Sequence, residues 1–296
     1  MLGDLLAVGC ALAWALAVLA FRQLKDFEPT SVNFFKNVVA SVLLLLTMLA
    51  MGVPFDMQRS ALDWGALLLS GLLGLAVADT LFLAGLRRID ASVAAIADCA
   101  YSPTVLVLST LVLGEVLHPA LLIGAPLVVL GLAIVSWEGS LPSLSGKRVE
   151  VRKIDRIGFL LAVLGVITTA IGVVLAKGAL DRSHLLEATT IRLCAGSLGI
   201  LVFSLGRGRV KELFTLFRPQ PAWKPAFIAT LLGTYISMLL WLGGMKYGTT
   251  SRAALLNQLG AVFVLMFSAM GGEAVPLRRW LGASVAIVGV AVVLLA

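Results

Sequence analysis

The sequence predicts an all-α polytopic membrane protein with ten transmembrane helices, arranged as two inverted repeats of five helices each. Three observations predict this fold class. First, the chain is 60% hydrophobic and only 13% charged, whereas an average soluble domain carries about 25% charged residues. Second, apolar runs recur along the whole chain, with the length of about 20 residues that a helix needs to cross a bilayer. Third, a segment of the first half is repeated at the end of the chain.

The repeated segment comprises residues 85–135, which align with residues 244–295. Composition alone would match apolar residues but would not keep glycines and charges in step, so we infer an internal duplication. In a membrane protein, such a duplication is typical of transporters. The matched positions are Gly85 with Gly244, Arg87 with Lys246, Ser92 with Ser251, Ala94-Ala95 with Ala253-Ala254, Asp98 with Asn257 and, after one deleted residue, Gly114-Glu115 with Gly272-Glu273, Gly124 with Gly282 and Gly131 with Gly289.

The apolar runs predict ten helices in order along the chain. Their expected ranges are 5–21, 30–51, 64–86, 91–113, 120–137, 157–179, 186–205, 226–245, 251–270 and 277–295. Most prolines lie in the loops between them, where a missing N–H is harmless. Pro103 and Pro126 lie inside apolar runs, where each proline frees a carbonyl that needs another partner. We therefore expect the fourth and fifth helices to be bent.

The longest polar segment, residues 138–156, separates a first five-helix repeat at 1–137 from a second at 157–296. Because five is an odd number, the two repeats must enter the membrane in opposite senses. The first two helices of each repeat also pair, less clearly, with Lys36 facing Arg192.

The net charge of +7 does not indicate a nucleic-acid partner, because the basic residues lie in short loops between helices. Most of them lie on the side opposite the chain termini. The positive-inside rule, applied alone, therefore places both termini outside the cytoplasm. The N-terminus lacks a basic region before its apolar run, so we expect no cleaved signal peptide.

No residue pattern predicts an enzyme, a metal site or a bound cofactor. His118 and His184 are predicted to lie in loops without neighbouring ligands, which argues against a metal. The sequence contains neither His-Glu-x-x-His nor Gly-x-Ser-x-Gly, and no histidine falls within a predicted helix. A membrane enzyme would need such a convergent group. Cys10, Cys99 and Cys194 have no paired spacing and are interpreted as small buried apolar residues.

Polar residues inside the predicted helices are the candidates for a substrate site, because each costs several kcal/mol to insert unless it faces a cavity or a partner. Spacings of three and four residues place several of them on common helix faces. We expect these faces to converge on a central water-filled cavity. The predicted substrate-binding residues are Trp14, Asn33, Lys36, Asn37, Asp79, Asp98, Tyr101, Arg192, Tyr235, Trp241, Asn257 and Gln258.

Two interpretations of these residues stay open. In the functional one, Asp79 or Asp98 binds an amine or a proton, and Lys36 and Arg192 hold a carboxylate or a phosphate. In the structural one, Lys36 forms a static buried bridge with Asp98 or Asp79, and Arg192 extends to the membrane interface. The tyrosines and tryptophans could stack on a substrate or simply pack.

Glycines line one face of the fifth helix and one face of the tenth. Gly124, Val128 and Gly131 share the first face, and Gly282, Ala286 and Gly289 share the second. Small residues at this spacing allow close backbone approach between helices. The faces predict either the seam of a homodimer or an intrachain contact.

Taken together, these features resemble the EamA-type exporters of the drug/metabolite transporter superfamily. The resemblance rests on the two five-helix repeats, the Gly-Glu pair after the fourth helix of each, the glycines of the fifth helices, Lys36 and Arg192 early in the second helices, and Trp14. It implies a basket-like helical fold, alternating access, and export of small metabolites, including amino acids in some members. Family members usually have a strongly basic loop after the second helix, and their termini are cytoplasmic. In this chain, Arg59 is the single basic residue of that loop. Orientation and transport direction therefore stay open.

We expect a multi-pass protein of the cell (inner) membrane that transports small amphipathic solutes. Its two halves would rock around the cavity, driven by the solute gradient or by protons carried on Asp98 or Asp79. The alternative is an exchanger of phosphorylated or anionic solutes that uses Lys36 and Arg192. A membrane enzyme ranks lower because no catalytic group is found in the sequence. A non-transporting scaffold also ranks lower, because the loops are too short to fold as separate domains.

Overall fold

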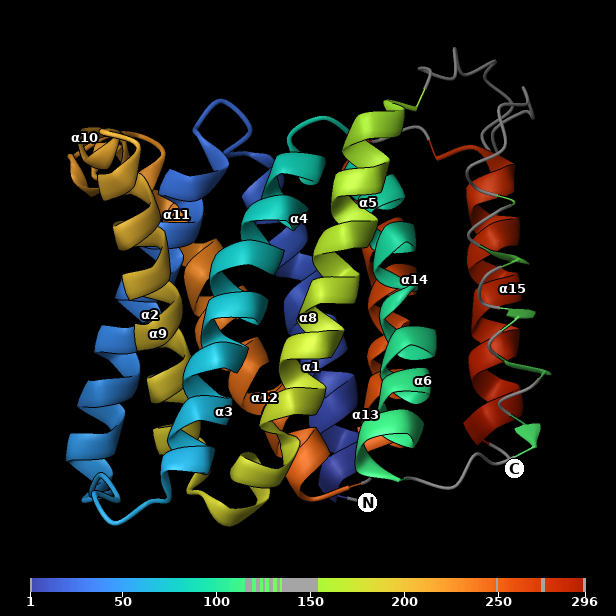
Figure 1. Cartoon of the computed structure of the whole chain (residues 1–296). Helices are drawn as coiled ribbons and strands as arrows, with labels where there is room; N and C mark the ends of the chain where they lie inside the picture. The colour runs from blue at the N-terminus through green and yellow to red at the C-terminus, as the bar shows by residue number, and fades with distance from the viewer. Residues whose placement is uncertain are drawn as a thin grey trace.

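The computed structural model describes residues 2–114, 154–248, 250–272 and 275–294, together with positions 119, 120, 123, 124, 126, 127, 130, 131 and 134. The regular elements in this part of the chain are helices, which stand side by side in one bundle (Figure 1). Seven of the described helical segments are long and apolar enough to span a membrane. The all-α polytopic fold predicted from the sequence is therefore confirmed.

The first repeat begins with two uninterrupted helices, α1 (Leu2–Arg22) and α2 (Pro29–Met51). The third span is continuous in space but changes its helix type along its length, from α3 (Ala61–Gly71) through η1 (Leu72–Ala78) to α4 (Asp79–Leu86). The fourth span consists of α5 (Ala91–Asp98) and α6 (Tyr101–Leu113). Local signals set the ends: Pro29 occupies the first turn of α2, and Ser60 Oγ accepts a hydrogen bond from the backbone N–H of Asp63 at the start of α3.

The second repeat follows the same plan. Asp155 caps the first helix, because its Oδ1 accepts the backbone N–H of Gly158 at 3.0 Å. The elements are α8 (Arg156–Arg182), α9 (Leu185–Gly206), the short α10 (Val210–Leu213) and η2 (Thr215–Phe217), then α11 (Trp223–Thr230), η3 (Leu231–Ile236), α12 (Ser237–Lys246), α13 (Thr250–Asn257), α14 (Leu259–Met270) and α15 (Leu277–Leu294).

The fourth span of each repeat is interrupted at matching positions. The α5–α6 interruption falls at Cys99 and Ala100, and the α13–α14 interruption falls at Gln258. Pro103 is the third residue of α6, where the first turn leaves its N–H without a helical partner in any case. The fourth helix, which was predicted to be bent, is thus interrupted just before Pro103. The second predicted bend, at Pro126, lies in a helix of which only scattered positions are described.

Both third spans contain a π-helix at positions that the duplication pairs. η1 begins at Leu72 and η3 begins at Leu231, which are separated along the chain by the same interval as Gly85 and Gly244. π-Helical turns are rare and occur frequently at functional sites. Their recurrence in both halves indicates that they are part of the architecture.

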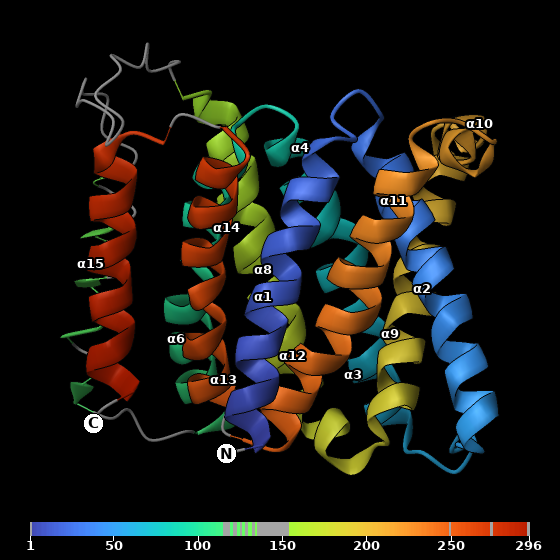
Figure 2. The ribbon, with the colours of Figure 1, turned by 180° about the vertical axis from the view of Figure 1, so that it is seen from behind.

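The two repeats run in opposite directions and exchange their first helices. α1 begins at the end of the bundle where the N-terminus lies, whereas α8 begins at the other end (Figures 1 and 2). α1 packs on α12 and α14 of the second repeat, and α8 packs on α4 and η1 of the first. The inverted-repeat architecture predicted from the sequence is therefore present.

Glycines make these exchanged contacts close. A Cβ at Gly85 would lie 2.6 Å from the carbonyl oxygen of Gly158, near the start of α8, and a Cβ at Gly244 would lie 3.3 Å from that of Gly3, near the start of α1. The same contact thus occurs twice, once in each direction between the repeats.

The glycine face of the predicted fifth helix contacts the tenth helix of the same chain. A Cβ at Gly131 would lie 2.5 Å from the carbonyl oxygen of Gly282 and 3.0 Å from the Cβ of Ala286 in α15. Of the two expectations for these faces, the structure therefore shows the intrachain contact at Gly131. Val128 of this face lies outside the described residues.

Candidate functional site

A cavity lies in the middle of the bundle, between the two repeats. Its volume, measured as the space open to the centres of water molecules, is about 100 Å³. One water molecule needs about 10–15 Å³ of such space, so the cavity has room for several waters or a small solute. Eight of the twelve predicted site residues line it: Trp14, Lys36, Asp79, Asp98, Tyr101, Arg192, Trp241 and Asn257.

Lys36 and Asp79 form an ion pair in the cavity wall. Lys36 Nζ lies 2.5 Å from Asp79 Oδ2 and also donates to Asn37 Oδ1 at 3.0 Å. The side chains are 6% and 19% exposed. The structural interpretation of Lys36 therefore holds with Asp79, and not with Asp98, as its partner. The two charges compensate each other, which a buried pair requires.

Asn33 and Asn37 do not line the cavity but hold the π-helix beside it. Asn33 Nδ2 donates to the carbonyl oxygens of Leu75 and Ala76, at 2.8 and 3.2 Å, and to Thr80 Oγ1 at 2.9 Å. Asn37 Nδ2 lies 3.3 Å from the same Leu75 oxygen. Asp79 directly follows η1, so these amides fix the backbone that carries its carboxylate.

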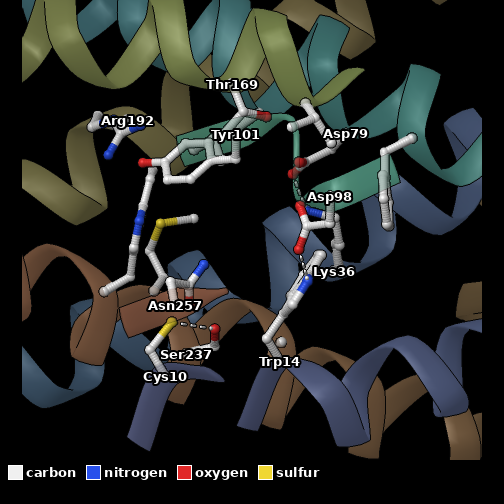
Figure 3. A pocket seen from close by; sticks show the side chains of 16 residues that line it. Cys10, Trp14, Lys36, Asp79, Asp98, Tyr101, Thr169, Arg192, Ser237 and Asn257 are labelled. Atoms are coloured by element: carbon white, nitrogen blue, oxygen red, sulfur yellow. Dashed lines mark hydrogen bonds and ion pairs between the residues drawn. The ribbon is translucent and has the colours of Figure 1, made fainter. Parts of the chain in front are cut away.

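Asp98 holds a carboxylate at the end of α5 without a basic partner among the described residues. Its Oδ2 accepts a hydrogen bond from Trp14 Nε1 at 3.0 Å, and the Trp14 ring lies 5.7 Å from the ring of Phe82. The indole thus orients the carboxylate but leaves its negative charge uncompensated (Figure 3).

Arg192 is the opposite case, a buried cation without a hydrogen-bonding partner. Its side chain projects from α9 and the residue is 1% exposed, so it does not extend to the membrane interface. Within the described part of the chain, none of its three guanidinium nitrogens makes a hydrogen bond. The guanidinium carbon lies 5.7 Å from the centre of the Trp241 ring, which offers partial compensation through a cation–π contact.

Two further polar atoms in the cavity wall lack partners. Tyr101 Oη and Asn257 Oδ1 are buried without a hydrogen bond among the described residues. The Tyr101 and Trp241 rings lie 5.9 Å apart, and Tyr101 lies between Arg192 and Asp98 in the view of Figure 3. Most buried polar groups in proteins are hydrogen-bonded, so a group of such atoms around one cavity indicates a place for a polar ligand or ordered water.

The two remaining predicted residues lie elsewhere. Tyr235 Oη pairs with Thr47 Oγ1 of α2 at 2.7 Å. Gln258 is buried between α13 and α14. Neither contributes to the cavity wall.

Several residues that line the cavity are not among the twelve predicted substrate-binding residues. Cys10 Sγ lies 3.3 Å from Ser237 Oγ, and Met238 and Thr169 also line the wall. Cys10 was interpreted only as a small buried residue. Met238 could have been found from the duplication, since it occupies the position that matches Asp79.

No metal centre is found in the described residues, which contain no group of three or more His, Cys, Asp or Glu placed to hold a metal ion. The cavity instead offers one cation without a hydrogen-bond partner among the described residues, Arg192, and one carboxylate without a basic partner among them, Asp98. Aromatic rings from Trp14, Tyr101 and Trp241 lie between and beside them. This arrangement suits a small solute that carries both charges on an apolar body.

Comparison with known proteins gives three findings. The sequence model of the EamA-like transporter family matches residues 1–137 and 156–295. A protein of Archaeoglobus fulgidus described as an uncharacterized transporter is 31% identical over 149 residues, which cover 49% of this chain and 52% of that protein; the chain thus spans about half the length of this curated relative. The alignment with a protein of known crystal structure covers 99% of this chain and 96% of that protein's chain, with a TM-score of 0.70 and 18% sequence identity. The two proteins therefore share a fold.

Proposed function

Because the chain belongs to the EamA-like transporter family, we propose that it is a secondary transporter, rather than an enzyme, that exports small zwitterionic metabolites such as amino acids. The site is the central cavity, and the solute crosses the membrane by alternating access. The cell (inner) membrane is the expected location.

The observation that carries this proposal is that one cavity holds a guanidinium without a hydrogen-bond partner and a carboxylate without a basic partner among the described residues. Arg192 presents three guanidinium nitrogens with no protein partner among the described residues. A carboxylate can accept two of these N–H groups side by side. Asp98 presents a carboxylate that only Trp14 contacts by a hydrogen bond, and this group suits an ammonium. A zwitterion would therefore offer a partner to each of these two charged groups.

The alternative, an exchanger of phosphorylated or anionic solutes, has less support. It requires Lys36 and Arg192 to act together on one anion, but Lys36 is already engaged by Asp79 and Asn37. A phosphate would meet Arg192 alone and would be repelled by Asp98.

Three features of the fold support alternating access. The two repeats are inverted, their fourth spans are interrupted beside the cavity, and interactions between the repeats hold both ends of the bundle. At one end, Arg59 Nη2 lies 2.7 Å from Glu187 Oε2. At the other end, Arg279 Nη2 lies 3.2 Å from Asp90 Oδ2. Breaking one interaction while keeping the other would open the cavity to one side at a time.

Proton coupling would use Asp98 rather than Asp79. Asp79 is bound to Lys36 at 2.5 Å, so protonating it would leave a buried ammonium without its counter-ion. Asp98 has no basic partner among the described residues and could take up a proton when no ammonium is present. The alternative driving force is the solute gradient alone.

The deciding experiment compares matched solutes. A thermal-shift screen of the purified protein against amino acids identifies a ligand, because a ligand of the native state raises the apparent stability. Exchange in proteoliposomes is then measured for leucine, for isocaproate, which lacks the amine, and for isoamylamine, which lacks the carboxylate. For a zwitterion site, loss of either charged contact weakens binding about 10- to 100-fold. Equal transport of leucine and isocaproate, or transport of sugar phosphates but not amino acids, would refute the proposal.

A further inference from the structure

Residues 207–224, which comprise the segment after α9 and the first two residues of α11, form a compact and strongly basic surface, which we name the basic knot. Its basic side chains are exposed: Arg207, Arg209, Lys211, Arg218 and Lys224. The segment contains one acidic residue, Glu212, whose Oε1 lies 3.8 Å from Arg209 Nε. The knot therefore has a clear excess of positive charge.

The basic knot is anchored to the bundle by its apolar residues. Leu213 and Leu216 are buried, at 1% and 0% exposed. The Phe217 ring lies 5.0 Å from that of Phe35 in α2. Ser31 Oγ at the start of α2 lies 2.8 Å from Thr215 Oγ1. These contacts present the basic side chains from a fixed platform.

The knot joins two helices that are long and apolar enough to span a membrane, so we expect it at the level where hydrocarbon meets the polar headgroups. The membrane-spanning helices end at Gly206 on one side of it and begin at Trp223 on the other. The Arg207 guanidinium lies 4.3 Å above the ring of Phe203, which is half exposed on the outer face of α9. A cation above an exposed aromatic ring is the arrangement of a side chain that extends from the hydrocarbon towards the headgroups.

Trp223 gives a second marker of this level. It is 44% exposed, and its indole Nε1 donates to the carbonyl oxygen of Leu216 at 2.7 Å. Exposed tryptophans with one polar contact are typical of membrane interfaces. The knot also lies at the outer edge of the bundle, at the upper left of Figure 1 and the upper right of Figure 2, where lipid would be within its reach.

We propose that the basic knot is a binding surface for the headgroups of anionic phospholipids. Its charge complements the headgroups, and its exposed rings, Phe214 and Trp223, suit the adjoining acyl chains. A soluble acidic partner could bind the basic side chains but would not contact these rings at the hydrocarbon boundary. Clusters of lysine and arginine beside a transmembrane helix recognise anionic lipid in this way. The knot lies on the side that the positive-inside rule assigns to the cytoplasm. The proposal is independent of the transported solute.

The test uses the full chain reconstituted in an equimolar mixture of phosphatidylcholine and phosphatidylglycerol. Native mass spectrometry then measures how much of each lipid stays bound. We expect the native protein to retain more phosphatidylglycerol than phosphatidylcholine. In the variant R209Q/K211Q/R218Q, the ratio of bound phosphatidylglycerol to bound phosphatidylcholine should fall about tenfold or more. The matched control, K25Q/R87Q/R88Q, removes three exposed basic residues at the same end of the bundle and should keep the preference.

A second variant keeps the test valid if the triple variant folds poorly. E212Q removes the single acidic side chain of the knot and should increase phosphatidylglycerol retention, an effect that high salt should remove. Equal retention of the two lipids by the native protein, or equal losses in the knot variant and the control, would overturn the proposal.

Discussion

Asp98 is the last residue of α5 and Asn257 is the last residue of α13, and the duplication that pairs these positions in the sequence brings both side chains to the wall of one cavity. The two interruptions of the fourth spans therefore meet at the centre of the bundle. One repeat supplies a carboxylate there and the other a neutral amide. The charge of the cavity is asymmetric although its backbone is duplicated, and a solute would bind in a defined orientation.

Asp98→Asn should reduce transport of a zwitterion without unfolding the protein. The amide oxygen of asparagine can still accept the hydrogen bond from Trp14 that Asp98 accepts at 3.0 Å, while the negative charge is lost. We expect leucine transport to fall about 10- to 100-fold, with isocaproate transport changed much less. Equal reduction for both solutes, measured by exchange in proteoliposomes, would show that Asp98 does not contact the amine.

If protons drive transport, the same variant should also lose its response to a pH gradient. A proton carried on Asp98 requires a carboxylate, which asparagine lacks. The measurement is leucine accumulation in proteoliposomes with and without an imposed pH gradient. A gradient response that survives in the double variant D79N/D98N would exclude both carboxylates as carriers and leave the solute gradient as the driving force.

Arg192→Met should raise the stability of the protein while it lowers transport. The native guanidinium is 1% exposed and lacks hydrogen-bond partners among the described residues, so its removal relieves a desolvation cost of about 1–3 kcal/mol. Thermal unfolding in detergent measures the first effect and leucine exchange the second. Arg182→Met is the control, because Arg182 is exposed and its pair with Asp63 is screened by solvent and should contribute little to stability. A large loss of stability in Arg192→Met would show a structural role instead.

Lys36 and Asp79 should behave as one unit. Asp79→Asn leaves the buried Lys36 ammonium without its counter-ion at 2.5 Å, and we expect a loss of about 3 kcal/mol in unfolding free energy. The double variant K36M/D79N should recover most of this loss, since neither charge remains. A double-mutant cycle on thermal unfolding checks this coupling, and additive losses would contradict it.

The fold was predictable because hydropathy and the register of the duplication are properties of the sequence. The partners of the polar residues were not. The spacing of Asn33 and Asn37 places them on one helix face, but it does not show which carbonyls that face meets. Those carbonyls belong to η1, and an extra residue per π-helical turn rotates all later side chains. For the same reason the sequence could not choose between Asp79 and Asp98 as the partner of Lys36.

Gly85→Ala should destabilise the contact between the repeats, because a Cβ there would lie 2.6 Å from the carbonyl oxygen of Gly158, closer than van der Waals contact allows. We expect a loss of about 1–3 kcal/mol in thermal unfolding measurements. Gly244→Ala, at the matching contact, meets the oxygen of Gly3 at 3.3 Å and should cost less. Gly65→Ala in α3 is the control, since no atom lies within 4 Å of the new Cβ, and it should raise stability by about 0.5–1 kcal/mol. If Gly85→Ala were as stable as Gly65→Ala, the helices could separate at no cost, and the close packing of α4 on α8 would not be needed for the native fold.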